Sequence, residues 1–227
     1  MEEKDILCDS SSLISLADAG LEGIFEFLAR KFKIKFIIPP SVEYETITRP
    51  LTSHIKQYAF SALKIKKSLN DKTLIKVDAN VETKANYIEG LANNLLYVRG
   101  KPLKLVHIGE AEMIALATEL SVKSILIDER TTRMLIEAPF KMKEHLELEF
   151  KTNIMVNSGN LKKFSELTFG MQAMRSSELL ILAYEHGFLD PYADLKEETL
   201  EAALHKIKFS GCSIRFDEIE EYVHSIQ

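Results

Sequence analysis

The sequence predicts an α/β fold, a parallel β-sheet sandwiched by helices, with a C-terminal helical appendage. Short apolar runs that end in a charged or polar residue are typical of strands, and they alternate with longer stretches of amphipathic helical periodicity. Strands and helices that alternate in this way form a parallel sheet flanked by helices. A length of 227 residues allows one such domain and a smaller appendage.

The elements follow from local patterns of apolar residues, caps and breakers. The expected strands, rich in Ile, Leu, Val and Phe, lie at residues 6–8, 31–38, 73–77, 125–127 and 153–156. The expected helices lie at residues 13–17, 21–30, 41–49, 54–69, 82–98, 109–120, 131–138, 177–186, 195–208 and 216–226. Pro50 is expected to end the helix that Ser41 begins. No strand is expected after residue 160, so residues 1–158 form the predicted α/β domain and 159–227 the helical appendage.

Composition restricts the function. A net charge of −5 argues against a protein that holds nucleic acid over its whole surface, although a local basic patch remains compatible with it. Cys8 and Cys212 show no zinc-ligand spacing and are interpreted as reduced structural thiols of a cytoplasmic protein. The N-terminus does not resemble a signal peptide, and no apolar run is long enough for a membrane span.

Two acids frame the stretch of residues 103–130. Glu110 stands at the start of a helix, above the buried positions Met113 and Ile114, and Asp128 ends the following strand. Helix starts and strand ends are where α/β folds build sites. Glu110 also has a simpler explanation, since an acid in the first turn interacts favourably with the helix dipole. Glu112 is expected to face solvent.

Two further acids lie at similar positions. Asp9 ends the first strand and precedes three serines, so it either belongs to a site or simply caps the next helix. Glu43 lies in the first turn of its helix, where the dipole explains it. Glu45 lies one step beyond that turn, and it could pair with Arg49 four residues later.

In a parallel sheet the strand ends and the following helix starts gather at one edge, so four acids could converge there. They are Asp9, Glu45, Glu110 and Asp128. Carboxylates brought together repel one another, and Mg²⁺ or Mn²⁺ would relieve the repulsion because both prefer oxygen ligands. Such an ion could activate water and stabilise charge on a phosphodiester. The sequence shows no Ser-His-Asp arrangement, Cys-His pair or Gly-rich phosphate loop.

Four segments, in order, resemble the acidic motifs of PIN-domain proteins: residues 9–14, 42–47, 110–117 and 125–130. In the second segment Glu45 matches better than Glu43. The pairing of Gly-Glu-Ala-Glu with Ile-Asp-Glu-Arg is similar to a prokaryotic, largely archaeal PIN subgroup in which a helical tail follows, and residues 179–225 look similar to that tail.

The resemblance implies an Mg²⁺- or Mn²⁺-dependent endoribonuclease that acts on RNA. The implied catalytic and metal-binding residues are Asp9, Glu45, Glu110 and Asp128, and secondary candidates are Ser11, Glu43, Glu112 and Glu129. Ser11 would position a ligand or phosphate. Many relatives are VapC-type toxins with an antitoxin partner, and a homodimer is implied as well. Residues 55–102 form a longer segment than compact toxins have. This difference argues against the toxin role but not against the nuclease role.

Two other functions compete with the ribonuclease. One is a non-catalytic PIN-fold module for RNA binding or protein interaction, favoured by the helical insertion and tail. The other is a phosphatase with an Asp nucleophile, which needs a second acid where Ser11 stands. An RNA track would need local positive charge, and the candidates are Lys31-Lys33-Lys35, Lys64-Lys66-Lys67, and Lys162-Lys163 with Arg175. Lysine runs of this kind also occur on solvated faces.

Overall fold

The structure is a computed structural model that describes residues 5–54 and 56–226. The chain divides into two compact units. The first unit comprises Met1–Val77, Leu126–Glu129 and Met174–Gln227, and the second comprises Asp78–Ile125 and Arg130–Ala173. Because the chain leaves and re-enters the first unit, segments far apart in the sequence build it together.

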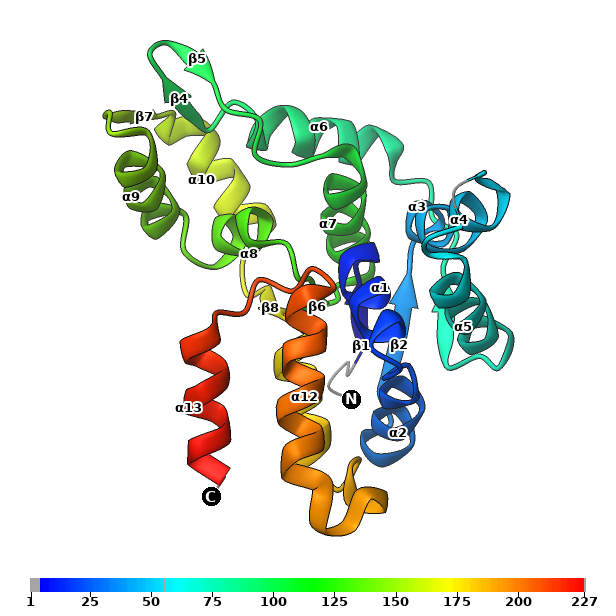
Figure 1. Cartoon of the computed structure of the whole chain (residues 1–227). Helices are drawn as coiled ribbons and strands as arrows, with labels where there is room; N and C mark the ends of the chain where they lie inside the picture. Colours follow the sequence, from blue (N-terminus) through cyan, green and yellow to red (C-terminus); the bar gives the residue numbers. More distant parts are fainter. Residues whose placement is uncertain (1–4, 55, 227) are drawn as a thin grey trace. The chain divides into compact units, whose positions relative to one another are not determined.

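Figure 1 shows the elements along the chain. The strands are β1 (Asp5–Cys8), β2 (Lys35–Ile38), β3 (Leu74–Lys76), β4 (Leu96–Val98), β5 (Lys101–Pro102), β6 (Ser124–Leu126), β7 (Ile154–Val156) and β8 (Gln172–Met174). The helices up to β6 are α1 (Ser10–Asp18), α2 (Gly23–Phe32), α3 (Pro40–Glu43), the π-helix η1 (Tyr44–Thr48), α4 (Arg49–Thr52), α5 (Ala59–Asn70), α6 (Glu82–Ala92) and α7 (Ile108–Leu120). The later helices are α8 (Arg130–Glu137), α9 (Pro139–Phe150), α10 (Ser158–Leu167), α11 (Ser176–Glu185), the 3-10 helix η2 (Asp190–Leu195), α12 (Lys196–Phe209) and α13 (Phe216–Ile226).

The central sheet has five strands in the order β3-β2-β1-β6-β8, and β1, β2 and β3 pair in parallel. Apolar residues fill its central strands without alternation: Leu7 and Cys8 of β1 and Phe36 and Ile38 of β2 have no exposed surface. Strands covered by helices on both faces have this composition. The predicted α/β fold with a parallel sheet between helices is therefore confirmed.

The expected strand at residues 31–38 begins later than predicted, because α2 continues to Phe32. Lys33 ends that helix in the left-handed conformation, with a φ of 58°. The side chain of Lys31 donates a hydrogen bond to the carbonyl of His186, 2.6 Å away. The alternating lysine face that the sequence suggested for Lys31, Lys33 and Lys35 is therefore not a strand face.

A second, antiparallel sheet of order β5-β4-β7 lies in the second unit. The helix expected to run to residue 98 ends at Ala92, and β4 follows it. Arg99 and Gly100 both have positive φ, the geometry of a two-residue hairpin turn, and Val98 pairs with Lys101 across it. The strand expected at 153–156 forms as β7 but pairs antiparallel with β4, so its predicted place in the parallel sheet was wrong.

The C-terminal segment contains one unexpected strand. β8 forms at the edge of the central sheet, although no strand was expected after residue 160. The three predicted helices that follow are confirmed as α11, α12 and α13, and α12 and α13 pack together (Figure 1). The domain boundary at residue 158 stays a prediction. Among the described residues no helix has both the length and the apolar composition needed to cross a membrane.

Candidate functional site

Asp9 lies directly after β1 and is only 6% exposed. Its backbone is extended and its side chain caps α1: Oδ2 accepts hydrogen bonds from the Ser11 amide at 3.0 Å and the Ser11 hydroxyl at 2.5 Å. The amide of Asp9 donates to the carbonyl of Leu126 in β6, which fixes the end of β1 in the sheet. The capping role left open by the sequence is therefore real, and it holds a carboxylate at the sheet edge.

Glu45 lies beside this carboxylate. The hydroxyl of Ser10 donates a 2.7 Å hydrogen bond to Oε2 of Glu45, a residue 35 positions later. Burial raises the pKa of Asp9, the hydrogen bonds from Ser11 lower it in part, and the negative charge of Glu45 raises it further. Two carboxylates distant in sequence therefore share one neighbourhood. Asp9, Ser10, Ser11 and Glu45 are called the Asp9 cluster below.

The helix that carries Glu45 is widened. Between α3 and α4, η1 is a π-helix in which the amide of Arg49 donates to the carbonyl of Tyr44, five residues back. Pro50 has no amide hydrogen, and its ring crowds the carbonyl four residues before it. One extra residue in the preceding turn accommodates the proline, and such π-turns are frequent at functional sites. The prediction that Pro50 ends the helix was wrong, since the helical path continues to Thr52.

Asp128 has no exposed surface, and Ser176 holds its carboxylate. The amide of Ser176 donates to Oδ1 and the hydroxyl of Ser176 to Oδ2, each at 2.7 Å. The amide of Asp128 donates at 3.3 Å to the hydroxyl of Ser11, which in turn donates to Asp9. Ser11 thus connects the two strand-end acids, and its predicted role of positioning a ligand or phosphate stays a prediction.

Arg175, next to Ser176, is buried and paired with two acids. Its guanidinium donates to Oε1 of Glu178 at 2.8 Å and to Oε2 of Glu218, in α13, at 2.7 Å. Burial alone would lower the pKa of Arg175, but the hydrogen bonds to Glu218 and Glu178 outweigh burial and raise it. The Asp128 cluster is the name used below for Asp128, Arg175, Ser176, Glu178 and Glu218.

This pairing corrects the sequence interpretation, because a buried Arg175 cannot belong to an exposed RNA track. Lys64 is unsuitable for a similar reason: its Nζ contacts the carbonyl of Ala17 and the carboxylate of Glu22. Sequence reasoning missed Ser176 and Glu218 altogether. The only local signal was the spacing of Arg175 and Glu178, which is that of a helix start.

The remaining candidate acids have other local roles. Glu110 lies in the second unit, where its Oε2 accepts a 2.8 Å hydrogen bond from the amide of His107 at the start of α7. Glu110 therefore caps the helix in whose first turn it lies, and its predicted role as a metal ligand stays a prediction. Glu43 forms an ion pair with Lys76 at 3.3 Å. Glu112 is half-buried, where an open position was expected, and Glu129 is half-buried after Asp128.

Neither cysteine is suited to nucleophilic chemistry. Cys8 and Cys212 are free and buried. Burial raises the pKa of both thiols, and the nearby carboxylates raise it further, Asp9 for Cys8 and Asp128 for Cys212. Both thiols are therefore protonated at neutral pH, as structural cysteines are.

The Asp9 cluster offers carboxylate oxygens to a divalent cation. Within the described part of the chain, no group of three or more His, Cys, Asp and Glu side chains is placed to hold a metal ion. Asp9 and Glu45 form a group of two. Mg²⁺ is usually bound through one or two carboxylates and keeps several waters. Burial is the main cause of the raised pKa of Asp9 and the charge of Glu45 adds to it, and a cation bound to both carboxylates would offset both effects. The pair therefore fits a hard divalent cation.

A pocket of about 460 Å³ in the first unit opens beside Glu45. It is called the Tyr58 pocket below and is lined by Ile14, Glu45, Arg49, Pro50, Ser53, Gln57 and Tyr58. Since Glu45 belongs to both, the pocket adjoins the Asp9 cluster.

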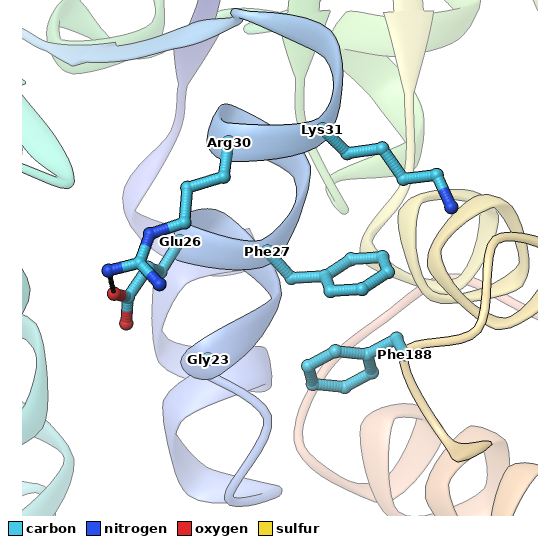
Figure 2. A pocket seen from close by; sticks show the side chains of 6 residues that line it. All are labelled: Gly23, Glu26, Phe27, Arg30, Lys31 and Phe188. Atoms are coloured by element: carbon cyan, nitrogen blue, oxygen red, sulfur yellow. Dashed lines mark ion pairs between the residues drawn. The ribbon is translucent and has the colours of Figure 1, made fainter.

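Another hollow of the first unit, about 520 Å³, lies beside α2. Figure 2 shows the rings of Phe27 and Phe188 facing each other there, with centroids 5.4 Å apart. Glu26 points away from these rings and forms a 2.5 Å ion pair with Arg30. No acid of the Asp9 or Asp128 cluster lines this hollow, so the candidate chemistry lies at the other pocket.

A family model described as a PIN domain matches residues 5–138, more than half of the chain. The matched range includes all four candidate acids. No curated protein and no solved structure matches the chain significantly.

Proposed function

Because this chain belongs to the PIN-domain family, whose members are generally nucleases, we propose that it is an Mg²⁺- or Mn²⁺-dependent endoribonuclease. The observation that carries the proposal is the juxtaposition of Asp9 and Glu45. A buried carboxylate with a raised pKa lies next to a second, exposed carboxylate, and Ser10 and Ser11 fix both by hydrogen bonds.

In this proposal the ligands of one or two ions are Asp9, Glu45, Glu110 and Asp128. When bound, the ion lowers the pKa of a water molecule and offsets charge on the phosphodiester. The protein's own part is to hold the carboxylates in place. Ser11 fixes Asp9 by two hydrogen bonds, Ser10 fixes Glu45, and Ser176 fixes Asp128.

The proposed substrate is RNA, and the proposed place of action is the cytoplasm, where buried free cysteines stay reduced. A homodimer and an antitoxin or other protein partner remain predictions that derive from the family resemblance. Glu112, Glu43 and Glu129 are left as secondary candidates.

A second candidate is a non-catalytic PIN-fold module that binds RNA or protein. The observation that favours it is the state of Asp128, whose two carboxylate oxygens already accept hydrogen bonds from Ser176. An acid used in this way supports the fold without an ion. The two candidates differ in whether a divalent cation binds and whether RNA is cut.

The decisive experiment measures cleavage of a labelled single-stranded RNA by the full chain with Mn²⁺, Mg²⁺ or EDTA. We expect cleavage that requires the cation and is lost in Asp9→Asn, since the amide keeps the shape of the side chain but not its charge. Asp217→Asn, which alters an exposed acid, is the matched control. Cleavage that persists in Asp9→Asn would contradict the proposal.

A further inference from the structure

The Tyr58 pocket combines groups that suit one nucleotide of a single-stranded RNA. Its wall from η1 and α4 presents the Glu45 carboxylate and the Arg49 guanidinium on one helical face, and α1 contributes the apolar side chain of Ile14. The loop before α5 adds Gln57 and the ring of Tyr58, which is 44% exposed. The volume of about 460 Å³ lies within the range of small-ligand pockets.

Each of these groups matches a part of a nucleotide. An exposed aromatic ring provides a face on which an unpaired base stacks. A guanidinium pairs with phosphate oxygens through a planar set of donors. The carboxamide of Gln57 offers both donors and an acceptor for a base edge. Glu45 is the one acid among the lining residues, so the remainder of the wall does not repel a phosphate.

Local charge supports the same occupant. The whole chain is acidic, so RNA needs a place where positive groups gather. Arg49 lines the pocket, the exposed Lys56 directly precedes Gln57 and donates a 2.6 Å hydrogen bond to the carbonyl of Leu51, and the exposed Phe60 follows Tyr58 closely. The phenylalanines beside the lysine runs considered from the sequence are less accessible, since Phe32 is half-buried and Phe36 and Phe164 are buried.

We propose that the Tyr58 pocket binds the nucleotide adjoining the cleaved bond of a single-stranded RNA, with its base on Tyr58 and its phosphate on Arg49. The position of the cleaved bond, at the Asp9 cluster, rests on the proposed ribonuclease function. The binding of RNA to the pocket is independent of that function. Tyr58 is then a binding residue that sets affinity, and Gln57 contributes to nucleotide preference.

The test measures binding and cleavage separately. Binding of a short fluorescein-labelled oligouridylate to the full chain is followed by fluorescence anisotropy in EDTA, where no cation supports cleavage. We expect Tyr58→Ala to raise Kd at least about fivefold, the lower end of the effect of losing one stacked base. Tyr58→Phe should retain the wild-type Kd, because stacking requires the ring and not the hydroxyl.

Tyr192→Ala is the matched control, since Tyr192 is a similarly exposed tyrosine, at 54%, in the same unit. Its Kd should equal that of the wild type. Equal Kd values for Tyr58→Ala and Tyr192→Ala, or no binding by the wild type, would overturn the assignment. A Tm of Tyr58→Ala equal to that of Tyr192→Ala excludes misfolding as the cause of a binding defect.

Cleavage of the same RNA with Mn²⁺ distinguishes the two proposals. If the assignment holds and the enzyme is active, Tyr58→Ala raises KM with little change in kcat. If the wild type cuts no RNA but Tyr58→Ala still weakens binding, the pocket assignment stands and the ribonuclease proposal fails. If the wild type cuts RNA and Tyr58→Ala binds and cuts as Tyr192→Ala does, the pocket assignment fails alone.

Discussion

Two buried carboxylates end neighbouring strands of one sheet, and the protein holds them in opposite ways. Asp9 faces the like charge of Glu45, and burial together with this charge raises its pKa. Asp128 accepts two hydrogen bonds from Ser176, which is flanked by the ion pairs of Arg175. The Asp9 cluster therefore places a buried carboxylate beside a second acid, a pair that a bound cation would stabilise, whereas both oxygens of Asp128 already accept hydrogen bonds within the fold.

The largest expected effect separates the clusters by stability. Asp128→Ala leaves the amide and hydroxyl of Ser176 buried without acceptors, so we expect a loss of about 2–5 kcal/mol of unfolding free energy. Asp9→Ala removes a helix cap, at about 1 kcal/mol, but also removes a buried charge beside Glu45, so its net loss should stay below about 1 kcal/mol. Urea denaturation measures both. Equal losses of unfolding free energy in Asp128→Ala and Asp9→Ala would contradict the proposed difference between the two clusters.

The next effect concerns catalysis at the Asp9 cluster. Glu45→Gln keeps the acceptor for Ser10 but removes the charge, and we expect RNA cleavage to fall about 10- to 100-fold, or about 1.4–2.7 kcal/mol of activation free energy. Initial rates with saturating Mn²⁺ provide the measurement. Glu26→Gln, an exposed residue of α2, serves as the control and should cut RNA at the wild-type rate. An unchanged rate in Glu45→Gln would remove Glu45 from the site.

Cation binding should distinguish the clusters in a thermal melt. A ligand that binds only the folded chain stabilises it, by about 1.4 kcal/mol at ten times its Kd. Mn²⁺ should therefore raise Tm in the wild type and Asp217→Asn but not in Asp9→Asn. The non-catalytic alternative predicts the same Tm with Mn²⁺ and with EDTA for all three proteins.

The smallest effect is the pH dependence of the Asp128 cluster. Burial raises the pKa of Glu218, but its hydrogen bond with Arg175 outweighs this, so the folded pKa lies below the ordinary value of 4.5. A lowered folded pKa contributes stability that is complete above 4.5 and is lost as pH falls through the folded value.

Glu218→Gln should accordingly cost about 1 kcal/mol at neutral pH and progressively less below pH 4.5, because protonation removes the same charge from the wild type. Denaturation of both proteins across this range checks the sign. Glu221→Gln, in the same helix, should show no such convergence. A difference that grows as the pH falls would contradict the assignment of Glu218.

The sequence predicted the elements whose pattern is local. Apolar runs identified the central strands, and Asp9 and Glu45 were found because each stands at the end or start of an element. The sequence did not reveal Ser176 as the partner of Asp128, because a contact between residues 48 positions apart produces no periodic pattern in the sequence. It also missed β8, whose Gln172-Ala173-Met174 lacks the apolar character of a buried strand. The hairpin turn at Arg99-Gly100 was interpreted as a helix end, because glycine suits both.

The distances along the chain between the partners of Asp128 also affect the order of folding. All members of the Asp9 cluster lie in the first 45 residues, so they leave the ribosome early in translation. The partner of Asp128, Ser176, is synthesised 48 residues later, and Glu218, the partner of Arg175, lies in the last helix described. Because contacts of long sequence separation form slowly, we expect nascent chains to close the Asp128 cluster last. Chaperones that meet this protein late in its synthesis would then encounter an exposed edge at β6, beside which β8 has yet to pair.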